Sequence, residues 1–529
     1  MNDEAPNNPR INLDGSYDEY TVKDFQVAMA EGNLSAEALV AYYTDRILRF
    51  DRNGPCLNSV LYLNEYAPAQ ASTLDRERKN GKLRGPLHGI PILIKGNINT
   101  GDGMPTTAGS LALKGFMAPG DAAVVRRLKE AGAVILGKTN LSEWANFRSR
   151  HSTSGWSSEG GQTRNPWALD RNPCGSSSGS AVAVSANLCA LAVGTETDGS
   201  ITAPSSVNGI VGIKPGIGLV SQEGIIPISF SQDTAGPMAR TLEDAAILLA
   251  AMVEKTGSAE PWMTQGFELP AGPGGALGGD QRAERGAAYG EGHQDLSGFR
   301  IALANNYSGM HPEIDLMVTR AADTLRALGA VVEETMIGID PKLEEAELEL
   351  LLYEFKYGLE KYLAAYGKGR MIQTLADLIA FNRDHAETVM PWFGQDLLEE
   401  AAKKKTLDEV AYTGARRDCL LYARVKGIDA TMDALKLDAI IAPSSCLAWK
   451  TDHILGDHYM GGCSSLPAIA GYPHLTVPSG LVHGLPMGLS FFGRAGSEAI
   501  LVRIGLTYER ATRCRRKPAM TSMLSADRI

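Results

Sequence analysis

The spacing of apolar and polar residues predicts helices at the start of the chain. In residues 20–50, apolar side chains recur three and four positions apart, which is typical of an amphipathic helix. The pattern is interrupted at Gly32-Asn33, and Ser35 is a suitable N-cap for a second helix. The sequence therefore predicts two short helices here.

From Gly85 to about Gly218 the pattern of apolar and polar residues changes. Short apolar runs alternate with clusters of glycine, serine, asparagine and aspartate, and the runs lie at 90–94, 133–136 and 191–193. A helical stretch at 121–131 separates the first two runs. Strands that alternate with helices predict an α/β sheet, in which site residues gather at strand ends and in the following loops.

The remainder of the chain divides into three segments that differ in composition and in predicted secondary structure. Residues 264–298 are rich in glycine and predict a surface excursion, whereas residues 343–435 predict a helical insertion. From Asp438 strand-like runs return, and a basic, solvated helix end is expected at about 508–517. Because the α/β pattern resumes after the helices, we expect one large domain spanning 1–529, with its core at about 20–515.

Composition and charge argue against a nucleic-acid-binding protein and against a membrane protein. The chain has 529 residues, 44% of them hydrophobic, and a formal net charge of −10. Such an acidic balance argues against nucleic acid as a partner. No apolar stretch approaches the ~20 residues that span a bilayer. The polar first residues carry no apolar signal-peptide core, so a cytoplasmic location without membrane attachment is the default expectation.

Cysteine and histidine usage gives no indication of a metal or another cofactor. The seven cysteines are scattered without a C-x-x-C pair, which favours reduced thiols over a disulfide framework. The nine histidines form no H-E-x-x-H motif and have no zinc-ligand spacing. We therefore expect chemistry carried by side chains alone.

Candidate chemistry concentrates in residues 172–215. Three serines lie between Gly175 and Gly179, an alanine-rich apolar stretch comes next, and the run T-D-G-S ends at Ser200. Serine hydroxyls beside apolar core segments must find partners. Gly199 allows backbone amides to turn inward, as an oxyanion hole requires.

Several further stretches act together as a signature. They are HGIPILIKGNI, GKTNLSEWANF, GGQTRNP, GTETDGSI, GIIPISFSQDTAGPMAR, LLLYEF, AGYPHLTVPSG and GLPMGLSFFG. In combination they resemble the amidase-signature family, and most closely its peptide amidases. The resemblance covers roughly residues 20–515. It implies an α/β fold with a large mixed β-sheet core that is flanked by helices on both faces.

The resemblance also implies a role for each motif residue. It makes Ser200 the nucleophile, Ser176 a bridging serine that comes after a cis peptide bond, and Lys95 the base. Ser177 and Asp233 are the supporting residues. The oxyanion hole would be formed by the backbone N–H groups of Thr197, Asp198, Gly199 and Ser200.

This assignment is chemically reasonable without the family name. A serine hydroxyl is a weak nucleophile until a base removes its proton, and no histidine lies near this segment. A buried lysine can serve, because desolvation disfavours its charged form. Gly96 comes after Lys95 where the family usually has aspartate, and Thr202 stands where many members have arginine. The effect of Gly96 on the lysine stays open.

The implied reaction is hydrolysis of a carboxamide C–N bond through an acyl-enzyme. C-terminal peptide amides or amino-acid amides are the expected substrates, and an aryl-acylamidase or carbamate hydrolase of the same family is the alternative. The amidase component of a tRNA-dependent amidotransferase would need partner subunits, and the helical segment around 350–362 argues against it. The oligomeric state stays open.

Two motifs suggest other classes of protein. Residues 175–179 fit G-x-S-x-G, which would make Ser177 the nucleophile of an α/β-hydrolase esterase. That elbow needs a preceding strand, and the preceding residues are polar. Residues 132–139 fit the nucleotide-binding P-loop motif, but the interior of the match is Ala-Val-Ile-Leu and predicts a strand. A chance match is therefore expected.

Overall fold

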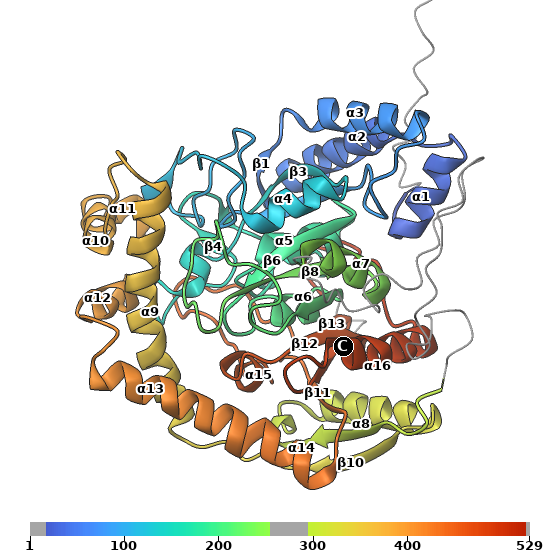
Figure 1. Ribbon diagram of the computed structural model, residues 1–529, viewed down its shortest axis with the longest axis vertical. Helices are drawn as coiled ribbons and strands as arrows, with labels where there is room; N and C mark the ends of the chain where they lie inside the picture. The colour runs from blue at the N-terminus through green and yellow to red at the C-terminus, as the bar shows by residue number, and fades with distance from the viewer. Residues whose placement is uncertain (1–16, 254–294, 525–529) are drawn as a thin grey trace, which may run out of the picture.

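One β-sheet of eleven strands forms the centre of the protein, as a computed structural model of residues 17–253 and 295–524 shows (Figure 1). The strands lie in the order β1-β3-β2-β6-β8-β7-β12-β13-β11-β9-β10. Their bounds are β1 Val60–Leu63, β2 Pro91–Lys95, β3 Val134–Thr139, β6 Leu191–Glu196, β7 Val211–Lys214, β8 Thr234–Ala239, β9 Arg300–Ala304, β10 Val331–Thr335, β11 Ala439–Pro443, β12 His474–Val482 and β13 Leu485–Phe492. Two further strands, β4 Trp156–Ser157 and β5 Gly161–Gln162, pair only with each other.

The sheet is mixed, as expected. Strand β2 runs parallel to both β3 and β6, so the three predicted apolar runs form adjacent parallel strands. Strand β8 then pairs antiparallel with β6 and β7. Every residue of β2, β3 and β6 is buried, which explains why these strands read as continuous apolar runs without alternation.

Helices cover both faces of the sheet. On one face of β12, Gly505 of helix α16 packs against Leu475 and Val477. Thr476 points to the other face, where it lies near Ser206 of helix α6. The helices outside the 343–435 region are α1 Val22–Ala30, α2 Ala36–Arg46, α3 Ala67–Lys79, α4 Ala123–Glu130, α5 Ser178–Ser185, α6 Thr202–Val207, α7 Leu242–Met252, α8 Pro312–Ala327, α15 Ser465–Ile469 and α16 Glu498–Thr512.

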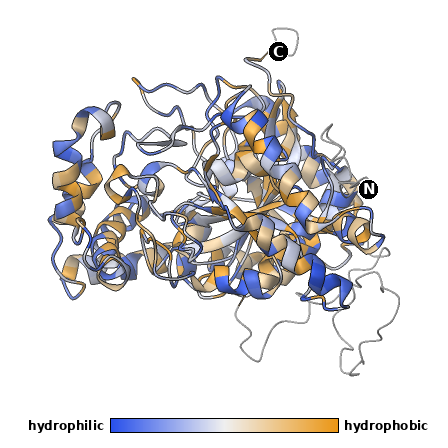
Figure 2. Cartoon of the chain, turned by 90° about the horizontal axis from the view of Figure 1, so that it is seen from above, coloured by the Kyte–Doolittle hydropathy of each residue, from blue (hydrophilic) through white to orange (hydrophobic). Residues whose placement is uncertain are grey.

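The region 343–435 is helical, as predicted, and runs along the left and lower edge of the molecule in Figure 1. Its helices are α9 Leu343–Tyr366, α10 Leu375–Asp384, α11 Ala386–Val389, α12 Asp396–Ala402, α13 Val410–Leu420, the π-helix η6 Leu421–Ile428 and α14 Asp429–Leu435. Strands β9 and β10 before this region belong to the same sheet as β11 after it. Most outer helices carry both hydrophilic and hydrophobic residues, as amphipathic covering helices do (Figure 2).

The two N-terminal helices confirm the prediction, and Ser35 caps α2 by accepting a hydrogen bond from the N–H of Ala38 at 3.1 Å. The glycine-rich excursion at 264–298 lies almost entirely outside the described residues.

The predicted basic helix end at 508–517 is wrong in its extent. Helix α16 ends at Thr512, and Arg513 has the left-handed φ of +46° that terminates it. Beyond it Arg515 is not solvated, because its side chain is 12% exposed and pairs with Glu19 at 3.0 Å. The chain therefore turns back to join its own N-terminal region.

Candidate active site

Lys95 ends the buried strand β2, the third of the eleven strands in the order of the sheet. It has no exposed surface, and its Nζ donates hydrogen bonds to the main-chain oxygen of Thr195 at 3.0 Å and to Thr195 Oγ1 at 2.9 Å. Strands β2 and β6 are parallel, so their carboxyl ends lie at the same edge of the sheet. This shared edge places Lys95 beside Thr195 even though the two are far apart in sequence.

Ser176 is the third partner of the lysine. Lys95 Nζ lies 2.8 Å from Ser176 Oγ, and both side chains are fully buried. The peptide bond between Gly175 and Ser176 is cis, in agreement with the resemblance. Ser176 is fixed from the other side as well, since its main-chain oxygen accepts the N–H of Ser142 at 3.1 Å.

Ser177 uses its hydroxyl to hold this turn against β6. Its Oγ donates to the oxygen of Thr195 at 3.0 Å and accepts the N–H of the same residue at 3.2 Å. The N–H of Ser177 donates to the main-chain oxygen of Ser200 at 3.1 Å. The serine-rich turn and the T-D-G-S turn are thus joined through their backbones.

Ser200 lies in the loop between β6 and α6. It is 6% exposed, whereas Lys95 and Ser176 are 0% exposed, so it is the member of this group that solvent reaches. Gly199 has a φ of +73°, a conformation that favours glycine. Among the hydrogen bonds of the described chain, no protein acceptor takes the N–H of Asp198, Gly199 or Ser200.

Glu196 orients the helix that comes after the loop. Its Oε2 accepts the N–H groups of Ile201 at 2.7 Å and Thr202 at 2.9 Å. These two groups lie at the N-terminus of α6, where backbone N–H groups have no acceptor within the helix. Burial raises the pKa of this carboxyl. Thr202, which replaces the arginine of many family members, adds a bond from its own hydroxyl to the same oxygen at 3.2 Å.

The electrostatics of the group favour a neutral lysine. Burial lowers the pKa of Lys95 to about 7, while the nearby Asp233 and Glu196 carboxylates act in the opposite direction. Asp233 is partly buried, its desolvation raises its pKa to about 7, and it accepts the hydroxyl of Thr197 at 2.6 Å. Asp233 therefore binds the T-D-G-S loop through Thr197 and also raises the pKa of Lys95 by its negative charge.

Comparisons with known proteins agree with this geometry. The family model described as Amidase matches residues 38–502. A probable amidase of Arabidopsis thaliana is 38% identical over 522 residues, covering 96% of this chain and 93% of the plant protein. The solved structure of the native peptide amidase from Stenotrophomonas maltophilia has a TM-score of 0.84 and 47% identity, and covers 96% of this chain and 99% of that one.

The chain belongs to the amidase family. It is an amidase enzyme with the fold of that family, in which a large mixed sheet is covered by helices. A more distant solved structure, that of an amidase family protein from Bacillus anthracis, has a TM-score of 0.79 and 33% identity, and covers 94% of this chain and 92% of that one.

Gly96 of this amidase lies in a space too small for a side chain. A Cβ at this position would lie 3.0 Å from the main-chain oxygen of Thr139 and 3.1 and 3.2 Å from methyl carbons of Leu141 and Leu61. A carboxylate side chain at this position would require these neighbours to move by a few tenths of an ångström. In this amidase, Asp233 and Glu196 supply the negative charge near Lys95 instead.

A cavity of about 640 Å³ adjoins the group on the side of Thr195, Thr197 and Asp233. Its walls are mainly apolar and come from residues 225–230 and from helix α9. Phe230 and Tyr357 close one part of it, with their rings in edge contact at 6.0 Å. The cavity could hold an apolar part of a substrate close to Lys95.

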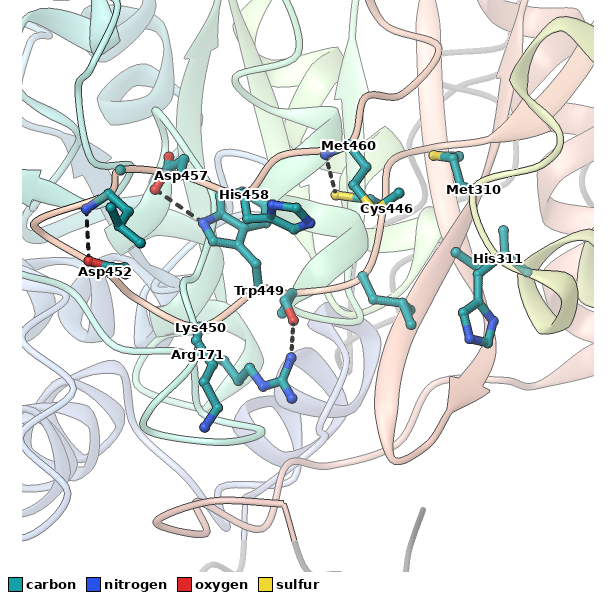
Figure 3. A pocket seen from close by; sticks show the side chains of 15 residues that line it. Arg171, Met310, His311, Cys446, Trp449, Lys450, Asp452, Asp457, His458 and Met460 are labelled. Carbon is teal, nitrogen blue, oxygen red and sulfur yellow. Dashed lines mark hydrogen bonds between the residues drawn. The ribbon is translucent and has the colours of Figure 1, made fainter.

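A second cavity of about 470 Å³ lies beneath the loop 446–460 (Figure 3). Trp449 donates its indole N–H to Asp457 Oδ1 at 3.1 Å, and Arg171 donates to the main-chain oxygen of Ala448 at 2.8 Å. None of the predicted catalytic residues is among those that line it. It is therefore separate from the candidate active site.

The two competing motifs are explained by the fold. Ser177 comes after irregular chain and not after the strand that a nucleophile elbow requires. The P-loop match lies mostly in β3, where Lys138 is buried and donates to the main-chain oxygen of Ile98 at 2.9 Å. That backbone is paired in a sheet, so it cannot wrap around a phosphate.

Within the described residues, no group of three or more histidine, cysteine, aspartate or glutamate side chains could hold a metal ion. No helix in the same part of the chain is long and apolar enough to cross a membrane.

Sequence reasoning missed three residues of the site. Thr195 contacts both Lys95 and Ser177, Glu196 caps α6, and Asn97 donates to Thr195 Oγ1 at 3.0 Å. All three lie inside the recognised runs HGIPILIKGNI and GTETDGSI. Their position in those runs indicated that they lie near the site, but only the hydrogen bonds show what each residue does.

Proposed function

We propose that this amidase hydrolyses carboxamide C–N bonds with Ser200 as the nucleophile, Ser176 as the bridging serine and Lys95 as the base. The observation that carries the proposal is the 2.8 Å contact between Lys95 Nζ and Ser176 Oγ in a fully buried setting. The N–H of Ser177 is bonded to the main-chain oxygen of Ser200, which supports the proposal that the hydroxyls of Ser176 and Ser200 exchange a proton.

The contacts of Lys95 favour a neutral base. A neutral amine has two N–H groups and one lone pair, and two of the three contacts of Nζ are to oxygen atoms of Thr195. With both N–H groups donated there, the lone pair is left for the hydroxyl proton of Ser176. Ser176 in turn accepts the proton of Ser200, which activates the nucleophile.

The reaction then proceeds through an acyl-enzyme. Ser200 Oγ forms a bond to the carbonyl carbon, and its proton passes through Ser176 to Lys95. The tetrahedral intermediate collapses with cleavage of the C–N bond, and the proton returns through Ser176 to the leaving nitrogen. Water then attacks the ester by the same route, which releases the acid and restores Ser200.

The backbone N–H groups of Thr197, Asp198, Gly199 and Ser200 are proposed to form the oxyanion hole. The absence of protein acceptors for the last three in the described chain supports this role, because free donors are needed where negative charge develops. Ser177 and Asp233 support the arrangement, the first by holding the serine turn on β6 and the second through the hydroxyl of Thr197.

C-terminal peptide amides are the proposed substrates. A solved structure titled as the peptide amidase PAM in complex with the competitive inhibitor chymostatin is 48% identical to this chain. The mainly apolar cavity beside Thr195 is large enough for the side chain of the residue that carries the amide. Aryl anilides and carbamates are the alternative, since the same acyl chemistry serves all three classes.

The test is hydrolysis of a panel by the full chain. The panel contains C-terminal peptide amides, amino-acid amides, aryl anilides and carbamates, and ammonia or amine release is measured for the wild type and for Ser200→Ala. Release of ammonia from peptide amides by the wild type alone is expected. Cleavage of anilides or carbamates with no action on primary amides would replace the proposed substrate class.

A further inference from the structure

The Asp198 side chain lies beside the nucleophile but takes no part in the proposed proton transfer. Its two carboxylate oxygens accept hydrogen bonds from the hydroxyls of Ser464 and Ser465, each at 2.6 Å. Asp198 is partly exposed, and Ser465 is exposed. Asp198 is two residues before Ser200 in the same loop, and its carboxylate binds this loop to the start of helix α15.

A second carboxyl group, from helix α9, is joined to the loop of Asp198 through Gln232. Glu347 accepts a hydrogen bond at 2.7 Å from Gln232 Nε2, and it is 9% exposed. Burial raises the pKa of Glu347, and the negative charge of Asp198 raises it further. Gln232 Nε2 also donates to the main-chain oxygen of Thr197, the residue before Asp198, at 3.4 Å, so acidic groups from two distant segments meet at the loop that carries Ser200.

No cation of the described chain forms a salt bridge with either of these carboxyl groups. Within the residues that the structure describes, neither Asp198 nor Glu347 has a salt-bridge partner within 4.0 Å. Lys214 is the cation that acts on Asp198, but its Nζ is directed to the main-chain oxygen of Tyr472 at 2.6 Å. Two uncompensated carboxyl groups in a partly buried place are costly unless a positive group joins them.

Gln232 has a buried amide oxygen without a hydrogen-bond donor in the described part of the protein. It is 1% exposed, and its amide is held at the pair by the bond to Glu347. Its other amide atom, Oε1, is buried and has no hydrogen-bond partner in the described part of the protein. A buried acceptor of this kind is usually satisfied, so Oε1 is available to a donor that a ligand brings.

We propose that Asp198, Glu347 and Gln232 form a subsite for a cationic group, an ammonium or guanidinium, that the amide substrate carries close to its scissile carbonyl. All three side chains offer oxygen acceptors, and ammonium and guanidinium groups offer donors only. The inference rests on the proposed role of Ser200. The cation can be the free α-ammonium of an amino-acid amide or the side chain of a C-terminal lysinamide or argininamide.

Two matched substrate pairs test the subsite and distinguish these sources. Nα-acetyl-lysinamide is compared with Nα-acetyl-norleucinamide, and leucinamide with 4-methylpentanamide, which lacks its amino group. We expect wild-type kcat/KM to favour the cationic member of at least one pair about tenfold or more, the size of one charged hydrogen bond. The pair that shows the preference identifies the source of the cation.

Glu347→Gln removes one charge with little change in shape, and it should abolish most of that preference through KM. Glu345→Gln is the matched control, because it removes the same charge from an exposed position on the same helix. An equal effect of both variants, or no preference in either wild-type pair, would overturn the subsite. The proposed function fails separately, if Ser200→Ala keeps its turnover of the neutral amides.

Discussion

Lys95 and Ser176 are 81 residues apart in the chain, yet Lys95 Nζ lies 2.8 Å from Ser176 Oγ. The contact depends on the parallel pairing of β2 with β6, and on Ser177, which fastens the serine turn to Thr195. Since both partners are fully buried, bulk water does not compete for the lysine. The amine is therefore held by Ser176 and Thr195 alone, and its basicity depends on this setting.

Replacing Lys95 should stop catalysis whether or not a positive charge is kept. Lys95→Ala should lower kcat by several orders of magnitude, comparable to Ser200→Ala, because members of a catalytic group act as a unit. Lys95→Arg should be nearly as damaging, since a guanidinium does not give up its proton in this pH range. Steady-state kinetics of the three variants measures this. Retention of most of the rate by Lys95→Arg would show that charge, and not basicity, is required.

Activity should fall on the acidic side of neutrality. Burial lowers the pKa of Lys95 from 10.5 to about 7, so the neutral base predominates above pH 7 and is lost as the pH falls through that value. The pH profile of kcat/KM should therefore have an acid limb with an apparent pKa near 7. Asp233 also titrates at about 7, so the limb belongs to the coupled pair.

The temperature dependence of that limb separates the two groups. An amine loses its proton more readily on warming, whereas the pKa of a carboxyl group hardly moves. A limb that shifts to lower pH between 10 and 35 °C, on the order of tenths of a unit, is expected for the lysine. A limb that stays in place would assign it to Asp233.

A fluorophosphonate should label Ser200. The residue is 6% exposed, whereas Ser177 is fully buried and has both its donor and an acceptor position engaged by Thr195. Peptide mass mapping of the labelled protein locates the adduct, and Ser200→Ala serves as the unlabelled control. An adduct on Ser177 would support the esterase elbow in place of the proposed mechanism.

Restoring the family's aspartate after the lysine should destabilise this protein. Gly96→Asp would bring a side chain within 3.0 Å of the main-chain oxygen of Thr139, and into contact with leucine methyl groups. We expect a loss of about 1–3 kcal/mol in the free energy of unfolding, typical of overpacking. Gly120→Asp is the control, because its Cβ would have no heavy atom within 4 Å. Equal melting temperatures for the two variants would contradict this account.

Activity should survive exhaustive dialysis against EDTA and phenanthroline, because the proposed proton transfers involve side chains alone. Ammonia release is measured before and after dialysis. Loss of activity that added zinc restores would refute the mechanism.

The sequence by itself determined the elements and the identity of the motif residues. Continuous apolar runs at 90–94 and 191–193 could only be buried strands, since their side chains need cover on both faces, and Gly199 could mark a turn because few other residues adopt its φ. The resemblance of the run GTETDGSI to the amidase-signature family made Ser200 the predicted nucleophile. The strand and turn signals are local properties of the sequence.

Only the tertiary structure decided which of these residues meet. Strand order is set by packing among distant segments, so nothing near Lys95 in sequence indicates that Thr195 will hold its amine. The pKa of that amine depends on complete burial and on Asp233, 138 residues further along, and neither is a property of the local sequence. The link from Glu347 through Gln232 to the loop of Asp198 likewise depends on the packing of helix α9 against a segment far away in the sequence.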